Sequence, residues 1–175
     1  ESAPAIAAAV ALGLALAATH AINQLADRES DRANGKLPYL ASGAVTPRAA
    51  RALVAVTAAA FLVVLFRVPV RLLPLEAAAL LLGIAYAAPP LRLKARAGWD
   101  LAANAFGYGG VAYAIGWGTA GPLSWGTIVP SATPWVLAVG GVFASSTVVD
   151  EPGDRAAGQA TLAVRLGPRG ARIGA

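Results

Sequence analysis

The segment NQLADRESD, residues 23–31, places one amide and two carboxylates at every fourth position. It follows an apolar run, residues 2–22, that contains no lysine, arginine, aspartate or glutamate. In a helix of 3.6 residues per turn, Asn23, Asp27 and Asp31 drift by only about 40° per step, so they line one face. Oxygen ligands of this kind favour a hard cation such as Mg²⁺. The end of this apolar helix is therefore a candidate metal site.

The pattern occurs a second time, far along the chain. Residues 27–35 read DRESDRANG and residues 150–158 read DEPGDRAAG, and both fit D-x-x-x-D-R-A-x-G. A single D-x-x-x-D is weak, because a solvated turn after a helix readily produces one. An internal repeat after two apolar segments is a stronger signal, since membrane sites are often built between two related halves of a bundle. The repeat makes Asp150 and Asp154 a second candidate pair.

The sequence leaves one feature of the second pair open and suggests how the neighbouring charged residues behave. Asp150 and Asp154 share a helical face if the helix continues to Asp154, but Pro152 and Gly153 could break it. We expect the neighbouring charged side chains to remain solvated; they are Arg28, Arg32, Glu151 and Arg155.

Four carboxylates that converge near a membrane boundary repel one another unless cations neutralise them. Mg²⁺ keeps several waters and readily shares phosphate oxygens, so two aspartate pairs favour a metal-bound diphosphate between them. A substrate with a diphosphate head at the membrane surface and a lipid body in the bilayer would fit such a site. A polyprenyl diphosphate has this form. We therefore expect the two pairs to face each other across a cavity, with carboxylates roughly 6–12 Å apart.

The composition indicates a membrane protein. Of 175 residues, 57% are hydrophobic and only 13% are charged, against about 25% charged in ordinary soluble domains. Apolar segments recur at about 3–25, 49–66, 74–89, 99–118 and 134–149. We predict an all-α, polytopic transmembrane helical bundle with about five spans, of which the third and fifth need flanking residues to cross about 30 Å of hydrocarbon.

Basic residues predict the orientation. If the chain crosses at each segment, residues 26–48, residues 90–98 and the tail from 150 share one side. With Arg51, that side carries twelve basic residues, and the other side carries only Arg67 and Arg71. The positive-inside rule makes the rich side cytoplasmic. We expect an integral protein of the cell (inner) membrane whose site faces the cytoplasm. The twelve are Arg28, Arg32, Lys36, Arg48, Arg51, Arg92, Lys94, Arg96, Arg155, Arg165, Arg169 and Arg172.

Other classes of site are excluded or disfavoured. The absence of cysteine excludes disulfides, thiolate catalysis and cysteine zinc sites. The net charge of +5 does not indicate a nucleic-acid partner, because the basic residues are spread over several loops. The chain begins with Glu1, contains no methionine and shows no signal peptide, so we expect it to be a piece of a longer protein.

Three segments resemble those of a known enzyme family. NQLADRESDRANGKLPYLASG is similar to the first N-x-x-x-D-x-x-x-D signature of the UbiA-type intramembrane prenyltransferases, closest to the homogentisate and 4-hydroxybenzoate prenyltransferases. DEPGDRAAGQATLAVRLG resembles their second aspartate-rich signature, and YAAPPLRLKARAGWDLAANAFGYG resembles the loop Y-S-x-P-P-x-R-x-K between them. The matches run in order across about residues 20–167.

The resemblance implies a bundle of nine helices. Residues 1–175 would form a single domain of this kind that is incomplete at both ends, and we expect this piece to be inactive on its own. It implies Mg²⁺-dependent transfer of a prenyl group from a polyprenyl diphosphate to an aromatic or lipid acceptor in the membrane. Asn23, Asp27, Asp31, Asp150 and Asp154 take the places of the metal and diphosphate cluster. Tyr86, Lys94 and Arg96 take the places of loop residues that contact the diphosphate or cap the cavity, and Lys36 takes that of a substrate-binding arginine.

The sequence departs from the family at two places, and two other functions stay open. The chain reads GKLPYL where many members have K-P-x-R-P, and Thr147 stands where many have a further aspartate. A transporter could use the acidic clusters for ions, although such residues usually lie near the midplane. A CDP-alcohol phosphotransferase also uses aspartates at a membrane boundary, although its D-G-x-x-A-R signature is absent. The acceptor is open among homogentisate, 4-hydroxybenzoate, a naphthoate, a chlorophyllide and a glycerol lipid.

Overall fold

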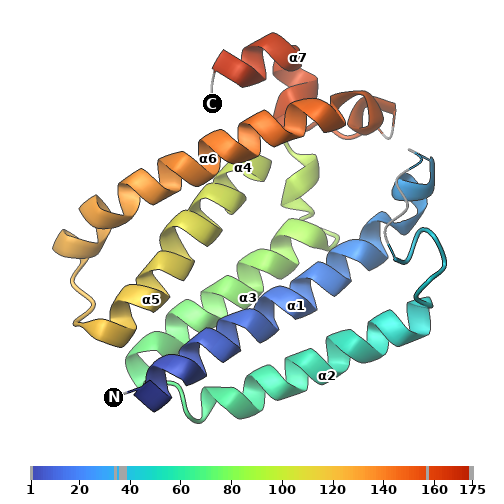
Figure 1. Ribbon diagram of the computed structural model, residues 1–175. Coiled ribbons are helices and arrows are strands. Elements are labelled where there is room, and N and C mark those ends of the chain that lie inside the picture. Colours follow the sequence, from blue (N-terminus) through green and yellow to red (C-terminus); the bar gives the residue numbers. More distant parts are fainter. Residues whose placement is uncertain (1, 34, 36–38, 157, 174–175) are drawn as a thin grey trace. The chain divides into compact units, whose positions relative to one another are not determined.

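The computed structural model describes residues 2–33, 35, 39–156 and 158–173. All the regular elements in these ranges are helices (Figure 1). The chain divides into two compact units, Glu1–Pro90 and Leu91–Ala175. Each unit carries one copy of the acidic repeat, and the helices of each unit are described separately below.

The first unit is an up-down-up arrangement of three long helices. They are α1 (Ser2–Ala33), α2 (Pro47–Leu65) and α3 (Leu73–Ala87), with a short 3₁₀ turn, Val70–Leu72, before α3. Figure 1 shows α1 in the middle, flanked by α2 and α3. Thr46 caps α2, because its side-chain oxygen accepts the amide of Ala49 at 3.2 Å, and Pro47 follows it in the first turn.

Small residues allow the helices of this unit to approach closely. Ala8, Ala11, Ala15 and Ala18 are buried along α1 at alternating spacings of three and four, which is the spacing of one helix face. On α3, a methyl group added at Gly83 would lie only 2.4 Å from Cγ2 of Thr19 on α1. Contacts of this kind hold membrane helices together, since lipid gives them little hydrophobic drive to associate.

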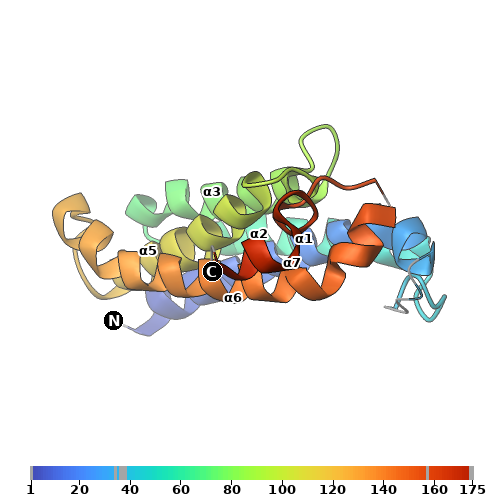
Figure 2. The same ribbon diagram turned by 90° about the horizontal axis from the view of Figure 1, so that it is seen from above.

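The second unit contains one long helix and a shorter, composite one. The composite run consists of α4 (Trp99–Asn104), a π-helix η3 (Ala105–Ala112) and α5 (Tyr113–Ala120). The long helix α6 spans Trp125–Ala156, and α7 (Leu162–Ile173) follows it. Figures 1 and 2 show α7 folded back beside the C-terminal half of α6, where Val148 and Ala163 form a small buried cluster.

Glycine brings the π-helix into backbone contact with α6. A methyl group added at Gly109 would lie 2.5 Å from Cα and 2.6 Å from N of Val136. Next to this contact the rings of Tyr113 and Trp135 stack with centroids 6.4 Å apart. The π-helix is thus placed against α6 by one residue that has no side chain.

These helices confirm the predicted all-α class and refine the predicted spans. Four described helices are long and apolar enough to cross a membrane: Ser2–Glu29, Pro47–Leu65, Val70–Ala87 and Trp125–Ala156. The segment expected at 99–118 is helical too, but the π-helix divides it, so it is not a continuous α-helical span. Large apolar side chains lie exposed on the described helices, for example Leu62, Val63, Leu137 and Val142, as expected where lipid replaces water.

Candidate functional site

The first acidic pair lies on an unbroken helix. Helix α1 continues to Ala33, so Asn23, Asp27 and Asp31 follow one another at helical spacing on one face, as predicted. All three side chains are partly buried. Each of them takes part in at least one hydrogen bond, ion pair or other electrostatic interaction. The last turns of α1 therefore present two carboxylates and an amide as a stripe.

The second pair lies on an unbroken helix as well. Helix α6 runs through Pro152 and Gly153 to Ala156, so Asp150 and Asp154 share a face. The possible break at Pro152 does not occur, because a proline removes one backbone hydrogen bond and the rest of the helix remains intact. The packing of Val148 on Ala163, one turn earlier, supports the helix at this point.

The two copies of the repeat end in the same backbone conformation. Helices α1 and α6 stop two residues before the glycine of D-R-A-x-G, and Gly35 and Gly158 have φ values of 67° and 68°. In each copy the glycine amide donates to the carbonyl of the repeat arginine, at 3.2 Å for Arg32 and 3.1 Å for Arg155. The repeat in sequence is thus also a repeat in structure, in which glycine permits a left-handed end to the helix.

The repeat arginines make equivalent contacts. Arg32 donates through Nε to the carbonyl oxygen of Ala41 at 2.9 Å, and Arg155 donates through an Nη to that of Val164 at 3.4 Å. In both cases the acceptor lies nine residues after the arginine. Arg155 also pairs with Glu151, whose side chain is only 12% exposed. The expectation that these side chains remain solvated holds for Arg32 and Arg155, which are exposed although each makes these contacts, and was wrong for Glu151.

The basic loop lies beside the chain that follows the second pair. Lys94 is buried in a 3₁₀ turn, Leu93–Ala95, and Arg96 is exposed just after it. The amide of Ala160 donates to the carbonyl of Ala95 at 3.2 Å, and Arg96 and Ala160 form a parallel β-bridge. Lys94 and Arg96 therefore lie next to Ala160, in the segment that follows Asp154 in sequence, and all of these residues belong to the second unit.

Asp100 and Thr161 were missed by the sequence analysis. Asp100 is 1% exposed and accepts the amides of Leu101 and Leu162, both at 2.8 Å. Thr161 is buried and donates to Oδ2 of Asp154 at 3.2 Å. A local signal existed for Asp100, since an acid in the first turn of a helix after a glycine often bonds backbone amides. Its partner 62 residues away gave no local signal.

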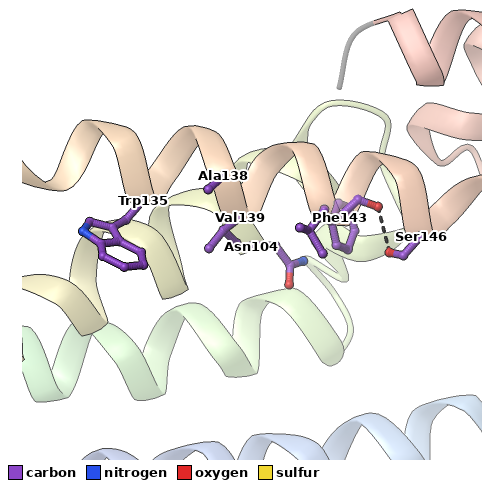
Figure 3. Close-up of a pocket in the computed structure, with 7 residues that line it drawn as sticks. Asn104, Trp135, Ala138, Val139, Phe143 and Ser146 are labelled. Atoms are coloured by element: carbon purple, nitrogen blue, oxygen red, sulfur yellow. Dashed lines mark hydrogen bonds between the residues drawn. The ribbon is translucent and has the colours of Figure 1, made fainter.

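A shallow groove of about 390 Å³ runs along α6 in the second unit. Figure 3 shows Asn104 between Trp135 at one end and Ser146 at the other. Ser146 is one turn before Asp150 on the same helix, so the groove leads toward the second acidic pair. Its walls are mostly apolar: Trp135, Ala138, Val139, Val142 and Phe143, with the polar Asn104 and Ser146.

The remaining predicted site residues are distributed over both units. Tyr86 is half-buried in the last turn of α3, in the first unit. Lys36 lies outside the residues that the structure describes. Within each unit, the described residues bring together no group of three or more His, Cys, Asp or Glu side chains. The convergence of the two pairs on one diphosphate stays a prediction.

Comparisons with solved structures identify the fold. A UbiA homolog from Archaeoglobus fulgidus bound to DMAPP and Mg²⁺ matches 98% of this chain at 21% identity, with a TM-score of 0.82. The same protein bound to GPP and Mg²⁺ matches with a TM-score of 0.81 at 22% identity. The apo structure of a UbiA homolog from Aeropyrum pernix K1 matches 99% of the chain at 27% identity, with a TM-score of 0.78.

The chain spans 60% of the Archaeoglobus protein and 65% of the Aeropyrum protein. That residues 1–175 form an incomplete domain stays a prediction. No curated protein sequence matches the chain at a significant level. The family model described as the UbiA prenyltransferase family matches residues 2–175, almost the entire chain. With this match and its four long apolar helices, the chain belongs to the UbiA prenyltransferase family and is an integral membrane protein.

Proposed function

We propose that the protein transfers a prenyl group from a prenyl diphosphate to an acceptor in the membrane, in a reaction that depends on Mg²⁺. One observation carries the proposal: both copies of D-x-x-x-D-R-A-x-G fold into the same helix end, each with two carboxylates on one helix face. Family membership and the DMAPP, GPP and Mg²⁺ bound to the Archaeoglobus homologue support it.

The chemistry of the acidic residues fits Mg²⁺. All the proposed ligand atoms are oxygens, from Asn23, Asp27 and Asp31 in the first unit and Asp150 and Asp154 in the second. Mg²⁺ prefers such ligands and commonly binds through one or two carboxylates together with phosphate oxygens. When bound, the ion would neutralise charge on the diphosphate leaving group. Asp150 and Asp154 lie on the same face of α6, as this role requires, because the helix is not broken between them.

The basic loop supplies fixed positive charge. We assign Lys94 and Arg96 to the diphosphate, because backbone contacts at Ala95 and Ala160 hold their loop next to the end of the second acidic copy. A preorganised cation stabilises negative charge that develops on a leaving group without reorganising in the reaction. Tyr86 is proposed to border the same opening, where an aromatic face would stabilise the allylic carbocation that forms as the C–O bond breaks. Lys36 is proposed to bind substrate as well.

We propose that the groove on α6 holds the hydrocarbon tail of the prenyl diphosphate. From Ser146 to Asp150 the helix rises only about 6 Å. A diphosphate at Asp150 and Asp154 would therefore leave the tail free to lie along Val139 and Phe143. The groove is open and apolar, as a lipid tail requires. The acceptor, aromatic or lipid, would attack the allylic carbon after the leaving group departs and then lose a proton.

Orientation is part of the proposal, with the acidic pairs at the cytoplasmic side of the cell membrane. Cysteines introduced at Ser42 and Gln159 should react with the same membrane-impermeant reagent, added from one side only. Gln159 is a better position than Gly158, whose φ of 68° disfavours any side chain. Labelling of the two cysteines from opposite sides would contradict both the topology and a shared site.

The reaction is tested with the full-length enzyme in membranes. Radiolabelled DMAPP or GPP is incubated with a panel of aromatic and lipid acceptors, with Mg²⁺ or with EDTA. We expect labelled product and released diphosphate with Mg²⁺ and neither with EDTA. Substrate uptake into vesicles without release of diphosphate would favour a transporter and refute the proposal.

A further inference from the structure

Asp100 joins two parts of the second unit that are far apart in sequence. It lies in the first turn of α4, directly after the basic loop, and only 1% of its surface is exposed. Its Oδ2 accepts the amide of Leu162, the first residue of α7, at 2.8 Å. Its Oδ1 accepts the amide of Leu101 at 2.8 Å. Both oxygens of this buried carboxylate are thus satisfied by backbone amides.

The charge of Asp100 suits these partners. Leu101 and Leu162 both lie at the N-terminal ends of helices, where amides lack intrahelical acceptors and the helix dipole favours a negative charge. A buried carboxylate needs such partners, because burial without them is costly. Hydrogen bonds to an ionised group are also stronger than those between neutral groups. Asp100 is therefore well suited to hold the two helix ends together.

The segment that Asp100 holds reaches the second acidic pair through one further contact. Thr161, the neighbour of Leu162, is 4% exposed and donates its hydroxyl to Oδ2 of Asp154 at 3.2 Å. On its other side, Ala160 donates its amide to Ala95, between Lys94 and Arg96. Three consecutive residues, 160–162, therefore contact the basic loop, an aspartate of the acidic pair and Asp100, respectively.

We propose that Asp100 is a positioning residue, which fixes Asp154 and the Lys94–Arg96 loop in one geometry by holding residues 160–162. This inference rests on the proposed function, because it takes Asp154 as a metal ligand and the loop as a diphosphate contact. Residues that orient metal ligands commonly change metal affinity or activity about 10–100-fold when mutated. Substitution of Asp100 is thus expected to weaken the binding of Mg²⁺ and diphosphate more than it slows the chemical step.

The test compares Asp100→Asn, Asp100→Ala and Thr161→Val in the full-length enzyme in nanodiscs. Binding of inorganic diphosphate is measured as a function of Mg²⁺, and amide exchange of residues 159–165 is followed by mass spectrometry. Thr46→Val is the matched control, since it also removes an oxygen that accepts an amide in the first turn of a helix, but in the first unit.

We expect Asp100→Ala to raise the Mg²⁺ concentration for half-maximal diphosphate binding about 10-fold or more, and to speed exchange in residues 159–165. Asp100→Asn keeps one acceptor oxygen and should fall between Asp100→Ala and the wild type. Thr161→Val should weaken Mg²⁺-dependent binding without releasing the Leu162 amide. Thr46→Val should change neither measurement by more than about two-fold.

Unchanged exchange in both Asp100 variants would overturn the proposal, because the hydrogen bonds would then not hold the segment. Faster exchange with unchanged Mg²⁺-dependent binding would also overturn it, since Asp100 would then be structural only. If the Asp100→Ala protein does not fold, Asp100→Asn and Thr161→Val still decide. Diphosphate binding that depends on Mg²⁺ and responds as expected, without prenyl transfer to any acceptor, would refute the proposed function while leaving the role of Asp100 intact.

Discussion

After the first acidic copy, Arg32 bonds the carbonyl of Ala41, and the chain then forms its own turns before Thr46 caps α2. After the second copy, Arg155 makes the equivalent contact to Val164, but the chain is also bonded to Ala95 and Asp100 from a distant loop. The local fold of the repeat is therefore the same in both units, and its surroundings differ. In the second copy, the tertiary contacts to Ala95 and Asp100 add positional control.

Buried acids show a second difference between the units. Glu76 on α3 and Asp100 on α4 are both almost fully buried, at 0% and 1% exposure. Asp100 accepts two backbone amides, whereas neither oxygen of Glu76 has a hydrogen-bond partner in the part of the chain that the structure describes. Burial of a polar group stabilises a fold only when its partners are present. The two acids should therefore affect stability in opposite directions.

The largest effect is expected from the shared feature, the acidic pairs. Asp27→Asn and Asp154→Asn each remove a charged ligand while nearly preserving shape, and each should lower turnover about 10²–10³-fold. Glu29→Gln is the matched control, because Glu29 lies on the same helix with a side chain 78% exposed. Turnover is measured with labelled prenyl diphosphate at saturating Mg²⁺. A near-normal rate for either aspartate variant would show that the two copies are not equivalent.

Gly109 tests the backbone contact of the second unit. Gly109→Ala places a methyl group 2.5 Å from Cα of Val136, and a backbone atom cannot move away as a side chain can. We expect a loss of about 1–3 kcal/mol in the free energy of unfolding. Gly110→Ala is the control, since its nearest neighbours would lie at 3.8 Å. Equal unfolding midpoints for the two variants in detergent micelles would contradict the close contact.

Glu76 should respond in the opposite way to Asp100. Glu76→Leu replaces a buried group without a described partner by an apolar one of similar size, and is expected to raise the free energy of unfolding by about 1–3 kcal/mol. Asp100→Leu, which leaves two amides without their acceptor, should lower it by a similar amount. Thermal unfolding of the purified variants measures both. A lower free energy of unfolding for Glu76→Leu would contradict this prediction, because it would mean that the carboxyl group makes a stabilising interaction.

The features that could be predicted from sequence are those set by local spacing. Aspartates at every fourth position predicted a helical stripe on α1 and left a second one open on α6, and both helices carry such a stripe. The repeat D-R-A-x-G predicted related segments, and Gly35 and Gly158 have the same left-handed backbone. A helix end and its glycine depend on a few neighbouring residues, so their pattern is readable in the sequence.

The features that escaped prediction depend on residues distant in sequence. The bond from Leu162 to Asp100 and the contact of Gly109 with Val136 each join segments whose spacing carries no period. The π-helix that divides the segment at 99–118 has the same apolar composition as an α-helix, so hydropathy did not reveal it. Tertiary packing decides these points, and local propensity does not.

The smallest effect is expected from the two repeat arginines, and it sharpens the comparison of the units. Arg32→Gln removes a 2.9 Å hydrogen bond to Ala41 and should cost about 0.5–1.5 kcal/mol. Arg155→Gln removes a longer bond of 3.4 Å and an ion pair whose arginine is 61% exposed, so it should cost about 0–1 kcal/mol. The contacts to Ala95 and Asp100 should also keep residues 159–165 in place when Arg155 is changed.

Amide exchange separates these two variants more sharply than global stability. Arg32→Gln should speed exchange in residues 39–45, whereas Arg155→Gln should leave residues 159–165 nearly as slow as in the wild type, because Asp100 and Ala95 still hold them. Arg51→Gln, at an exposed position on α2, controls for the loss of a surface charge. The double variant Arg155→Gln with Asp100→Asn should then exchange faster than the two single changes predict together. Strict additivity would mean that the arginine and Asp100 hold the segment independently.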